Sequence, residues 1–222
     1  MNLLIGTYRA NKDMMIDCLQ SITDFSKGDE DFIFIDDSGD AKFRTWLKDF
    51  GEVVPVHPTE SKQGFSKAMV TATRVMQEQE DEYVGWWEED FTAVAPIDFD
   101  AMADNLLLHR DLAQIVLVRQ PWFPLEIEAG SMLTHLCERM SQELVACPNV
   151  LDDEPPLLKH QMIFSTNPGV WSPLAYKWGW PDVWNSEERK TKYLVDDDDA
   201  WFAYWGEQET VHHDGERQGV GY

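Results

Sequence analysis

Apolar and polar positions alternate in blocks through the first half of the chain, and the blocks differ in their period. Met15, Ile16, Leu19 and Ile22 recur at helical spacing, which predicts a helix over residues 12–22. Short, wholly apolar runs predict strands instead. The predicted strands of this half are 3–5, 32–35, 53–56, 83–87 and 114–118, and further helices are predicted at 66–79 and 99–110. Strands and helices that alternate in this way are typical of a doubly wound α/β domain with a mostly parallel sheet flanked by helices.

The second half has a less regular pattern, rich in Pro and Trp. A helix is predicted at 130–145 and a short strand at 162–165. Residues 196–204 are predicted to open another helix, which ends near Gly206, and a last strand is predicted at 211–213. There is no internal repeat and no linker-like segment. We therefore expect a single domain over residues 1–222.

Composition and charge narrow the range of functions. The chain has 18 Lys and Arg against 41 Asp and Glu, a formal net charge of −23, which opposes binding to a phosphate backbone. Three cysteines without a CxxC pair indicate neither a disulfide framework nor a zinc knuckle. The first residues do not resemble a signal peptide, and no apolar run approaches the ~20 residues of a membrane span. We expect a soluble, cytoplasmic protein without a transmembrane segment.

Polar residues follow directly after the predicted strands. In an open parallel sheet the ligand binds beyond the carboxyl ends of the strands, so these residues should meet at one site. The apolar strand 83–87 runs into Glu88, Glu89 and Asp90. Carboxylate oxygens suit Mn²⁺ or Mg²⁺, and such an ion can bridge the phosphates of a nucleotide diphosphate. The alternative interpretation of this cluster is a solvated acidic turn.

The order of the motifs resembles the GT-A fold glycosyltransferases, of the inverting family-2 type, over nearly the whole chain. The segments that carry the resemblance are Gly6-Thr7-Tyr8-Arg9, FIFIDDSGD at 32–40, Lys62-Gln63-Gly64-Phe65-Ser66, Glu88-Glu89-Asp90, the four aspartates 196–199 and Thr210 to Gly215. The resemblance implies a metal-dependent enzyme that moves a sugar from a nucleotide-sugar donor to an acceptor hydroxyl, with inversion. It divides the domain into a nucleotide-sugar half, 1–120, and an acceptor-binding and catalytic half, 121–222.

The resemblance also implies roles for residues of the first half. Thr7, Tyr8 and Arg9 would flank the base, and Asp36 or Asp37 would accept a hydrogen bond from the pyrimidine ring or the ribose. Gly64 would allow close approach of the backbone, whereas Ser66 is better explained as a helix N-cap. Glu88 would face the ribose or a metal-bound water, Glu89 belongs to the same substrate-binding group, and Asp90 would bind the metal directly. Asp37 to Asp40 is equally an ordinary turn sequence.

In the second half, the resemblance places the catalytic base in the acidic run, with Asp197 as first choice and Asp198 as second. Crowded carboxylates have raised pKa values, which suits a base; the competing interpretation is a capped acidic helix start. A late strand would supply a metal-binding histidine. His212 and His213 face opposite ways on a strand, and the pattern favours His213.

Six tryptophans crowd the acceptor half, and about two of them are expected to touch an acceptor, with Trp180 as the candidate. The acceptor itself is not legible: a glycan, a lipid, a protein or a hydroxylated DNA base are all compatible with the sequence. Arg189, Lys190 and Lys192 could form a small basic patch beside it. Two other functions stay open, a non-catalytic sugar- or nucleotide-binding module and a nucleotidyltransferase, although the Lys-bearing phosphate loop of the latter is missing near the first strand.

Overall fold

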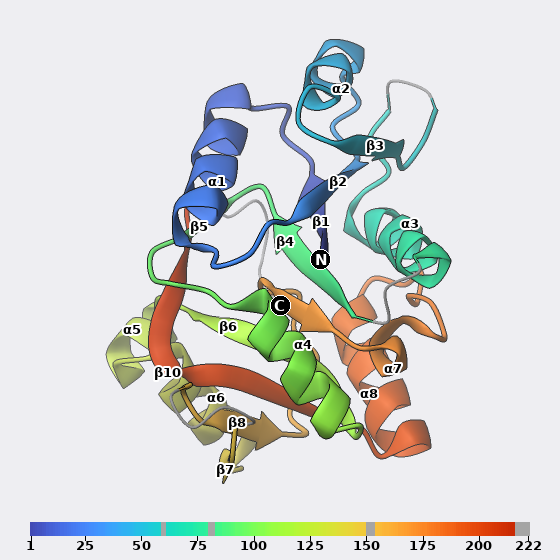
Figure 1. The fold of residues 1–222 in the computed structure, drawn as a ribbon. Helices are drawn as coiled ribbons and strands as arrows, with labels where there is room; N and C mark the ends of the chain where they lie inside the picture. Colours follow the sequence, from blue (N-terminus) through green and yellow to red (C-terminus); the bar gives the residue numbers. More distant parts are fainter. Residues whose placement is uncertain (59–60, 80–82, 150–153, 216–222) are drawn as a thin grey trace.

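The computed structural model describes residues 1–58, 61–79, 83–149 and 154–215, and it confirms the predicted α/β class (Figure 1). The strands are β1 Asn2–Thr7, β2 Asp31–Asp36, β3 Glu52–Pro55, β4 Val84–Glu88, β5 Phe91–Ala93, β6 Leu112–Arg119, β7 Val145–Cys147, β8 Leu157–His160, β9 Gly169–Trp171 and β10 Trp201–His213. The helices are α1 Lys12–Phe25, α2 Ala41–Leu47, α3 Phe65–Glu78, α4 Phe99–Leu108, α5 Pro124–Ala129, α6 Met132–Met140, α7 Pro173–Tyr176 and α8 Ser186–Asp198.

The strands β3, β2, β1 and β4 lie side by side in that order and are all parallel. Each connection between them is therefore a crossover, and the carboxyl ends of β1, β2 and β4 lie along one edge of the sheet. Local capping helps to set the crossovers. The Asn11 side chain accepts hydrogen bonds from two amides at the start of α1, and Asp40 does the same for α2.

The sheet changes character beyond β4. The short strand β9 lies between β4 and β6 and is antiparallel to both. A Cβ at Gly169 would lie 2.3 Å from the backbone oxygen of Ile115, so only glycine fits where β9 meets β6. The long strand β10 pairs in parallel with β6 and antiparallel with β8 at one end and with β5 at the other. β10 thus reaches from the far side of the sheet back to the segment that follows β4.

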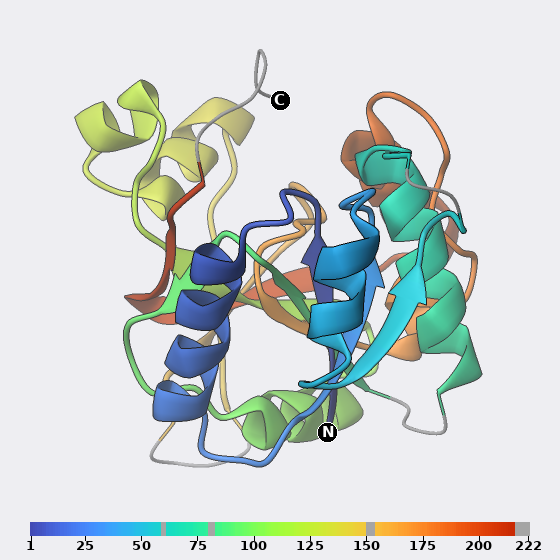
Figure 2. The same ribbon diagram turned by 90° about the horizontal axis from the view of Figure 1, so that it is seen from above.

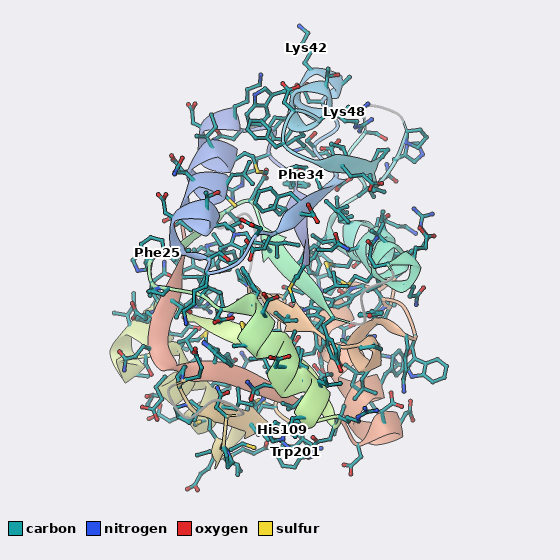
Figure 3. The ribbon with its side chains drawn as sticks, in the orientation of Figure 1. Phe25, Phe34, Lys42, Lys48, His109 and Trp201 are labelled. Atoms are coloured by element: carbon teal, nitrogen blue, oxygen red, sulfur yellow. The ribbon has the colours of Figure 1, made fainter. Side chains whose placement is uncertain are left out.

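Helices cover both faces of the sheet (Figure 2). On one face, α1, α2 and α4 bury residues such as Met15 and Phe99 against β1, β4 and β6. On the other, α3, α7 and α8 pack residues such as Met69 and Leu194 against the opposite sides of the same strands. Figure 3 shows Lys42 extending outward from α2, whereas Phe34 of β2 lies inside the fold. The two apolar layers hold the polar strand ends in a fixed frame.

Four details of the sequence prediction are wrong. Residues 162–165 form no strand. The helix predicted at 130–145 is shorter and spans Met132–Met140. The helix predicted to open at 196–204 is instead the end of α8, and the next residues begin β10. The N-cap of α3 is Gly64 and not Ser66, whose hydroxyl donates to the backbone oxygen of Val183.

None of the helices in the described part of the chain combines the length and the apolar character that a bilayer crossing requires.

Candidate functional site

A cleft of about 590 Å³ opens at the carboxyl ends of the parallel strands. Its walls come from the end of β1, the start of α3, the end of β4 and the end of β10. The structure brings together here nine of the residues predicted for the site: Thr7, Tyr8, Arg9, Asp37, Gly64, Glu88, Glu89, Asp90 and His213. Five others do not line the cleft: Asp36, Trp180, Asp197, Asp198 and His212.

The two aspartates after β2 have different surroundings. Asp36 is fully buried, and its carboxylate accepts hydrogen bonds from the Thr7 hydroxyl at 3.1 Å and from Arg44 Nε at 2.6 Å. The Asp36 carboxylate is therefore paired with Arg44 inside the protein and does not line the cleft. Asp37 lines the cleft, and its two oxygens accept hydrogen bonds from the amides of Gln63 and Gly64, both at 2.7 Å. Burial raises the pKa of Asp37 above its ordinary value, although these amides oppose the shift.

Gly64 owes its place to the backbone. Its φ of +89° lies in the left-handed region, which a side chain disfavours. With this conformation the chain turns from the loop held by Asp37 directly into the first turn of α3. The amino end of a 14-residue helix thereby faces the cleft, where its free amides and dipole favour a negatively charged ligand.

Glu89 organises the loop after β1. Its Oε1 accepts hydrogen bonds from the amides of Tyr8 at 2.8 Å and Arg9 at 2.5 Å, across 80 residues of sequence. Burial raises the pKa of Glu89 to about 7, and the two amides hold it from rising further. The role of this side chain is to fix the loop, which the acidic pattern alone could not indicate.

Asp90 and His213 meet in the cleft from distant parts of the chain. His213 Nε2 lies 3.6 Å from Asp90 Oδ2, and Arg9 Nη2 lies 3.6 Å from the same oxygen. β5 and β10 create this contact, because His213 pairs with Phe91 one residue after Asp90. His212 points the other way, towards Glu209, as alternation along a strand requires.

The His213 side chain is held in a defined position. The amide and carbonyl of its backbone are both hydrogen-bonded by the Gln120 side chain, at 2.9 and 3.1 Å. Its ring packs on Phe91 and Trp122 with centroids 4.7 and 4.1 Å away. Burial lowers the pKa of His213, which favours the neutral imidazole that a metal ion requires.

Several features of these side chains bear on whether a divalent cation fits between them. Glu88 Oε1, Glu89 Oε2 and His213 Nδ1 are buried without a hydrogen-bond partner among the described residues. A Cβ at Gly215 would lie 2.2 Å from Asp90 Oδ2 and 2.9 Å from the His213 ring, so glycine leaves this space open. No group of three or more His, Cys, Asp or Glu in the described chain is arranged to hold a metal. A site of one or two carboxylates completed by substrate phosphates and water is nevertheless common for Mg²⁺, and Asp90 supplies such a carboxylate here.

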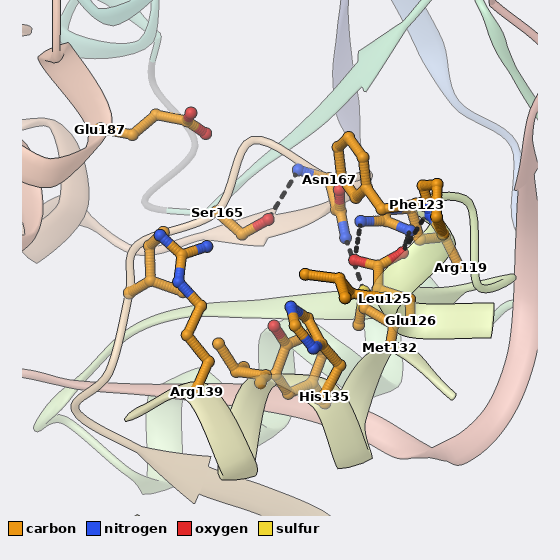
Figure 4. A pocket seen from close by; sticks show the side chains of 14 residues that line it. Arg119, Phe123, Leu125, Glu126, Met132, His135, Arg139, Ser165, Asn167 and Glu187 are labelled. Carbon is orange, nitrogen blue, oxygen red and sulfur yellow. Dashed lines mark hydrogen bonds and ion pairs between the residues drawn. The ribbon is translucent and has the colours of Figure 1, made fainter. Parts of the chain in front are cut away.

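A second pocket, of about 330 Å³, lies between α5, α6, the 163–167 loop and the start of α8 (Figure 4). Glu187 forms part of its wall. This residue is only 9% exposed, and its Oε1 accepts hydrogen bonds from the Thr166 hydroxyl at 2.9 Å and the Thr166 amide at 3.2 Å. Burial raises the pKa of Glu187 to about 7. Glu187 was not among the residues predicted from the sequence, although an acidic residue in the first turn of a helix is a signal that could have indicated it.

Glu88 connects the two pockets electrostatically. It lines the cleft, and burial together with the charges of Asp90 and Glu187 raises its pKa well above the ordinary value. Like-charged groups raise the pKa of a carboxyl only when they lie close by. The two pockets are also joined by Thr166, whose hydroxyl donates to Glu187 and whose backbone oxygen accepts a hydrogen bond from Nε1 of Trp86, a residue that lines the cleft.

The acidic run 196–199 lies elsewhere. It ends α8 and does not begin a helix, so the helix dipole opposes its charge. Asp198 forms an ion pair with Lys177 Nζ at 2.8 Å and accepts a hydrogen bond from Trp178 Nε1 at 3.1 Å, while Asp197 is exposed. Neither residue lines either pocket. The mistaken helix start came from residues 201–205, whose apolar run is a buried strand.

Trp180 is a core residue. It is 6% exposed and stacks on Trp171 with a centroid distance of 6.1 Å. Trp184, four residues later, is 98% exposed and lines the cleft, so it is the tryptophan of this segment that a ligand can reach. Lys190 is also buried, with Nζ donating to the Gly179 oxygen, and does not join a basic surface patch.

Comparisons with known proteins agree with this description of the fold. No protein-family model matches the sequence, and no curated protein matches it at a significant level. Among solved structures, the mannosyltransferase PcManGT from Pyrobaculum calidifontis, in complex with GDP-Man and Mn²⁺, superimposes with a TM-score of 0.62 at 12% identity, over 98% of this chain and 58% of that chain. S. aureus TarS 1–349, in complex with UDP, gives a TM-score of 0.58 at 12% identity, over 95% and 59%.

The chain thus spans less than two thirds of the length of these two structures. At 12% identity the likeness establishes the fold. The chain accordingly has the single mixed α/β sheet, flanked by helices, of these glycosyltransferase structures.

Proposed function

We propose that this chain is a glycosyltransferase that moves a sugar from a nucleotide-diphosphate donor to an acceptor hydroxyl. The observation that carries the proposal is the meeting of Asp90 and His213, within 3.6 Å of each other, in the cleft beyond the parallel strands. Ligands of open α/β sheets bind at this edge. The fold is shared with a mannosyltransferase structure that contains GDP-Man and Mn²⁺, which adds support for the reaction class.

The donor would lie along the loops that Asp37 and Glu89 hold in place. Tyr8 is 42% exposed and lines the cleft, so a base could stack on its ring. The Arg9 guanidinium is directed to Asp90 and could meet a phosphate oxygen as well. The nucleotide would thus be bound mainly by the first half of the chain.

A divalent cation fits beside the diphosphate. Asp90 and the neutral His213 imidazole would hold Mn²⁺ or Mg²⁺ in the space that Gly215 leaves open. When bound, such an ion neutralises the charge that develops on the leaving nucleotide diphosphate. Arg9 lies close enough to add to the same electrostatic effect.

Glu187 is our candidate for the base. In the proposed reaction the acceptor oxygen attacks the anomeric carbon, the bond from that carbon to the diphosphate oxygen breaks, and the hydroxyl proton passes to Glu187. Attack on the face opposite the leaving group inverts the configuration. A carboxyl with a pKa of about 7 matches a base that works near neutral pH. Asp197 and Asp198 lie outside both pockets and are the competing candidates to be tested.

The experiment measures donor binding and turnover together. UDP- and GDP-sugars would be titrated with and without Mn²⁺, and thermal midpoint and donor hydrolysis would be followed. We expect a metal-dependent rise in the midpoint, because a ligand stabilises the state that binds it. Asp90→Asn and His213→Asn should weaken donor binding by at least about tenfold, as loss of a metal ligand or its support generally does.

His212→Asn is the matched control, since it removes the neighbouring imidazole, which faces Glu209. Equal donor affinity in the Asp90→Asn variant and the unaltered protein would contradict the assigned role. Binding without any turnover across donors would support the non-catalytic module instead.

A further inference from the structure

We propose that the second pocket is the acceptor subsite and that it takes an acceptor bearing an anionic group, a phosphate or a carboxylate, bound by Arg139. This proposal rests on the proposed function, because it names the substrate class for the same transfer. It comes from the charges that line the pocket. Besides the Tyr204 hydroxyl, the titratable side chains there are Arg119, Glu126, His135, Arg139 and Glu187.

The charges of Arg119 and Glu126 cancel each other. Arg119 and Glu126 form a two-pronged ion pair, with Nη1 to Oε2 at 2.7 Å and Nη2 to Oε1 at 2.8 Å. Burial alone would raise the pKa of Glu126. The Arg119 guanidinium and the amides of Trp122 and Phe123 instead hold this pKa below its ordinary value. This pair is therefore a neutral, rigid part of the wall.

Arg139 has no such counterpart. Its side chain is exposed at the pocket and makes no hydrogen bond and no ion pair with any residue of the described chain, although acidic residues outnumber basic ones by 41 to 18. Figure 4 shows Arg139 and His135 projecting from α6 into the pocket, with Glu187 on the far side. A planar guanidinium suits two-pronged binding of phosphate or carboxylate.

The arrangement matches an acceptor with two functional ends. Its anionic group would bind Arg139 and His135, and its hydroxyl would reach Glu187, whose partner Thr166 also contacts Trp86 of the donor cleft. Phe123, Met132 and Leu136 give the pocket an apolar lining between these polar groups. Such a surface packs against the C–H faces of a sugar or polyol. A neutral acceptor would leave Arg139 without a role in the pocket.

The test uses the side-chain Nε–H signals of arginine in ¹⁵N NMR spectra of the whole chain. Arg139 reports on the second pocket, and Arg9 reports on the donor cleft. Matched small probes are glycerol 1-phosphate, glycerate and glycerol, and UDP and GDP with Mg²⁺ serve as donor-site probes. We expect the anionic probes to shift the Arg139 signal and the pocket amides of Ser165 and Asn167, and the nucleotides to shift Arg9.

Three variants make the result specific. Arg139→Gln should weaken binding of the anionic probes about tenfold, which corresponds to about 1.4 kcal/mol, and Arg139→Lys should retain part of it. Arg110→Gln removes the same charge from an exposed position outside both pockets and should change nothing. A shift from glycerol 1-phosphate alone assigns phosphate as the anion, and one from glycerate alone assigns carboxylate.

The failures are distinguishable. If the nucleotides do not shift Arg9, the proposed function fails, whatever happens at Arg139. If Arg9 responds but Arg139 is unmoved by both anions, or if glycerol acts equally, the acceptor is not anionic and Arg139 is a solvated surface residue. Unchanged affinity for the anions in Arg139→Gln would overturn the proposal as well.

Discussion

The two halves of the sheet supply site residues in different ways. In the parallel half, β1, β2 and β4 each deliver their residues to the cleft at the strand end or in the next few positions, so that Tyr8, Asp37 and Asp90 follow their strands within two residues. In the mixed half, His213 ends a 13-residue strand, and Glu187 lies in the first turn of a helix after a long irregular segment.

The difference teaches which inferences a pattern can support. A parallel strand has one direction, so its carboxyl end identifies the ligand side of the sheet. Strands such as β8 and β9 run antiparallel to their neighbours. The carboxyl ends of strands in this half therefore lie at both edges of the sheet, and a polar residue near a strand end can lie at either edge. Positions in the mixed half therefore need tests that compare one candidate directly with another.

The largest expected effect separates Glu187 from the acidic run. Glu187→Gln should lower kcat by roughly 10²–10⁴-fold, the usual contribution of a general base, with donor affinity unchanged. Asp197→Asn and Asp198→Asn should keep near-normal turnover, because neither residue lines a pocket. Transfer or donor-hydrolysis rates at saturating donor provide the measurement. Loss of turnover in an aspartate variant, with Glu187→Gln active, would return the base to the end of α8.

The next effect compares two tryptophans of the mixed half. Trp180→Ala should cost about 3–5 kcal/mol of unfolding free energy, because it opens a cavity beside Trp171 and Phe164. Trp184→Ala should change stability by no more than about 0.5 kcal/mol, since its side chain is exposed. Urea unfolding measures both. Trp184→Ala should instead raise the KM of the substrate that binds in the cleft. Equal destabilisation by the two variants would contradict the distinction between a core tryptophan and a cleft tryptophan.

The smallest effect is a change of stability with pH. Burial raises the pKa of folded Glu187 to about 7, from 4.5 in the unfolded chain, so ionising it costs folded stability as pH rises through this window. Glu187→Gln lacks that cost. Its stability relative to the unaltered protein should therefore increase between about pH 4.5 and 7 and then level off. The 2.5-unit difference corresponds to on the order of 3 kcal/mol at most.

Unfolding curves at several pH values test this expectation. Glu188→Gln is the matched control, because it makes the same substitution at the exposed neighbouring position. A stability difference that does not vary with pH for Glu187→Gln, or one that Glu188→Gln reproduces, would show that Glu187 is not buried in the way described.

Much of the fold was predictable because its signals are local. The apolar runs at β1, β2, β4 and β6 are too short for helices and are wholly buried or nearly so, which their composition reflects. The helical period at α1 and α3 marks faces that pack on the sheet. The segment 201–205 misled the prediction because a strand buried on both faces has no alternation to distinguish it from a buried helix.

The candidate site was predictable in part for the same reason. Asp90 and Asp37 follow apolar strands. Which of Asp36 and Asp37 is available to a ligand depends on Arg44, because Arg44 forms an ion pair with Asp36. The function of Glu89 depends on amides 80 residues away. Glu187 and Trp184 lie in a segment where no periodic pattern indicates what is buried and what is exposed.

The sequence by itself determined the α/β class, the crossovers of the parallel half and the acids that follow its strands, because these depend on hydrophobic period and strand direction within short windows. Only the tertiary structure decided which acids line the cleft, that His213 and not His212 meets Asp90, and that Glu187 rather than the aspartate run lines the second pocket. These outcomes depend on long-range pairing of β10 with β5 and on partners such as Arg44 and Lys177. Burial and charge compensation are properties of the packed chain, and no local pattern encodes them.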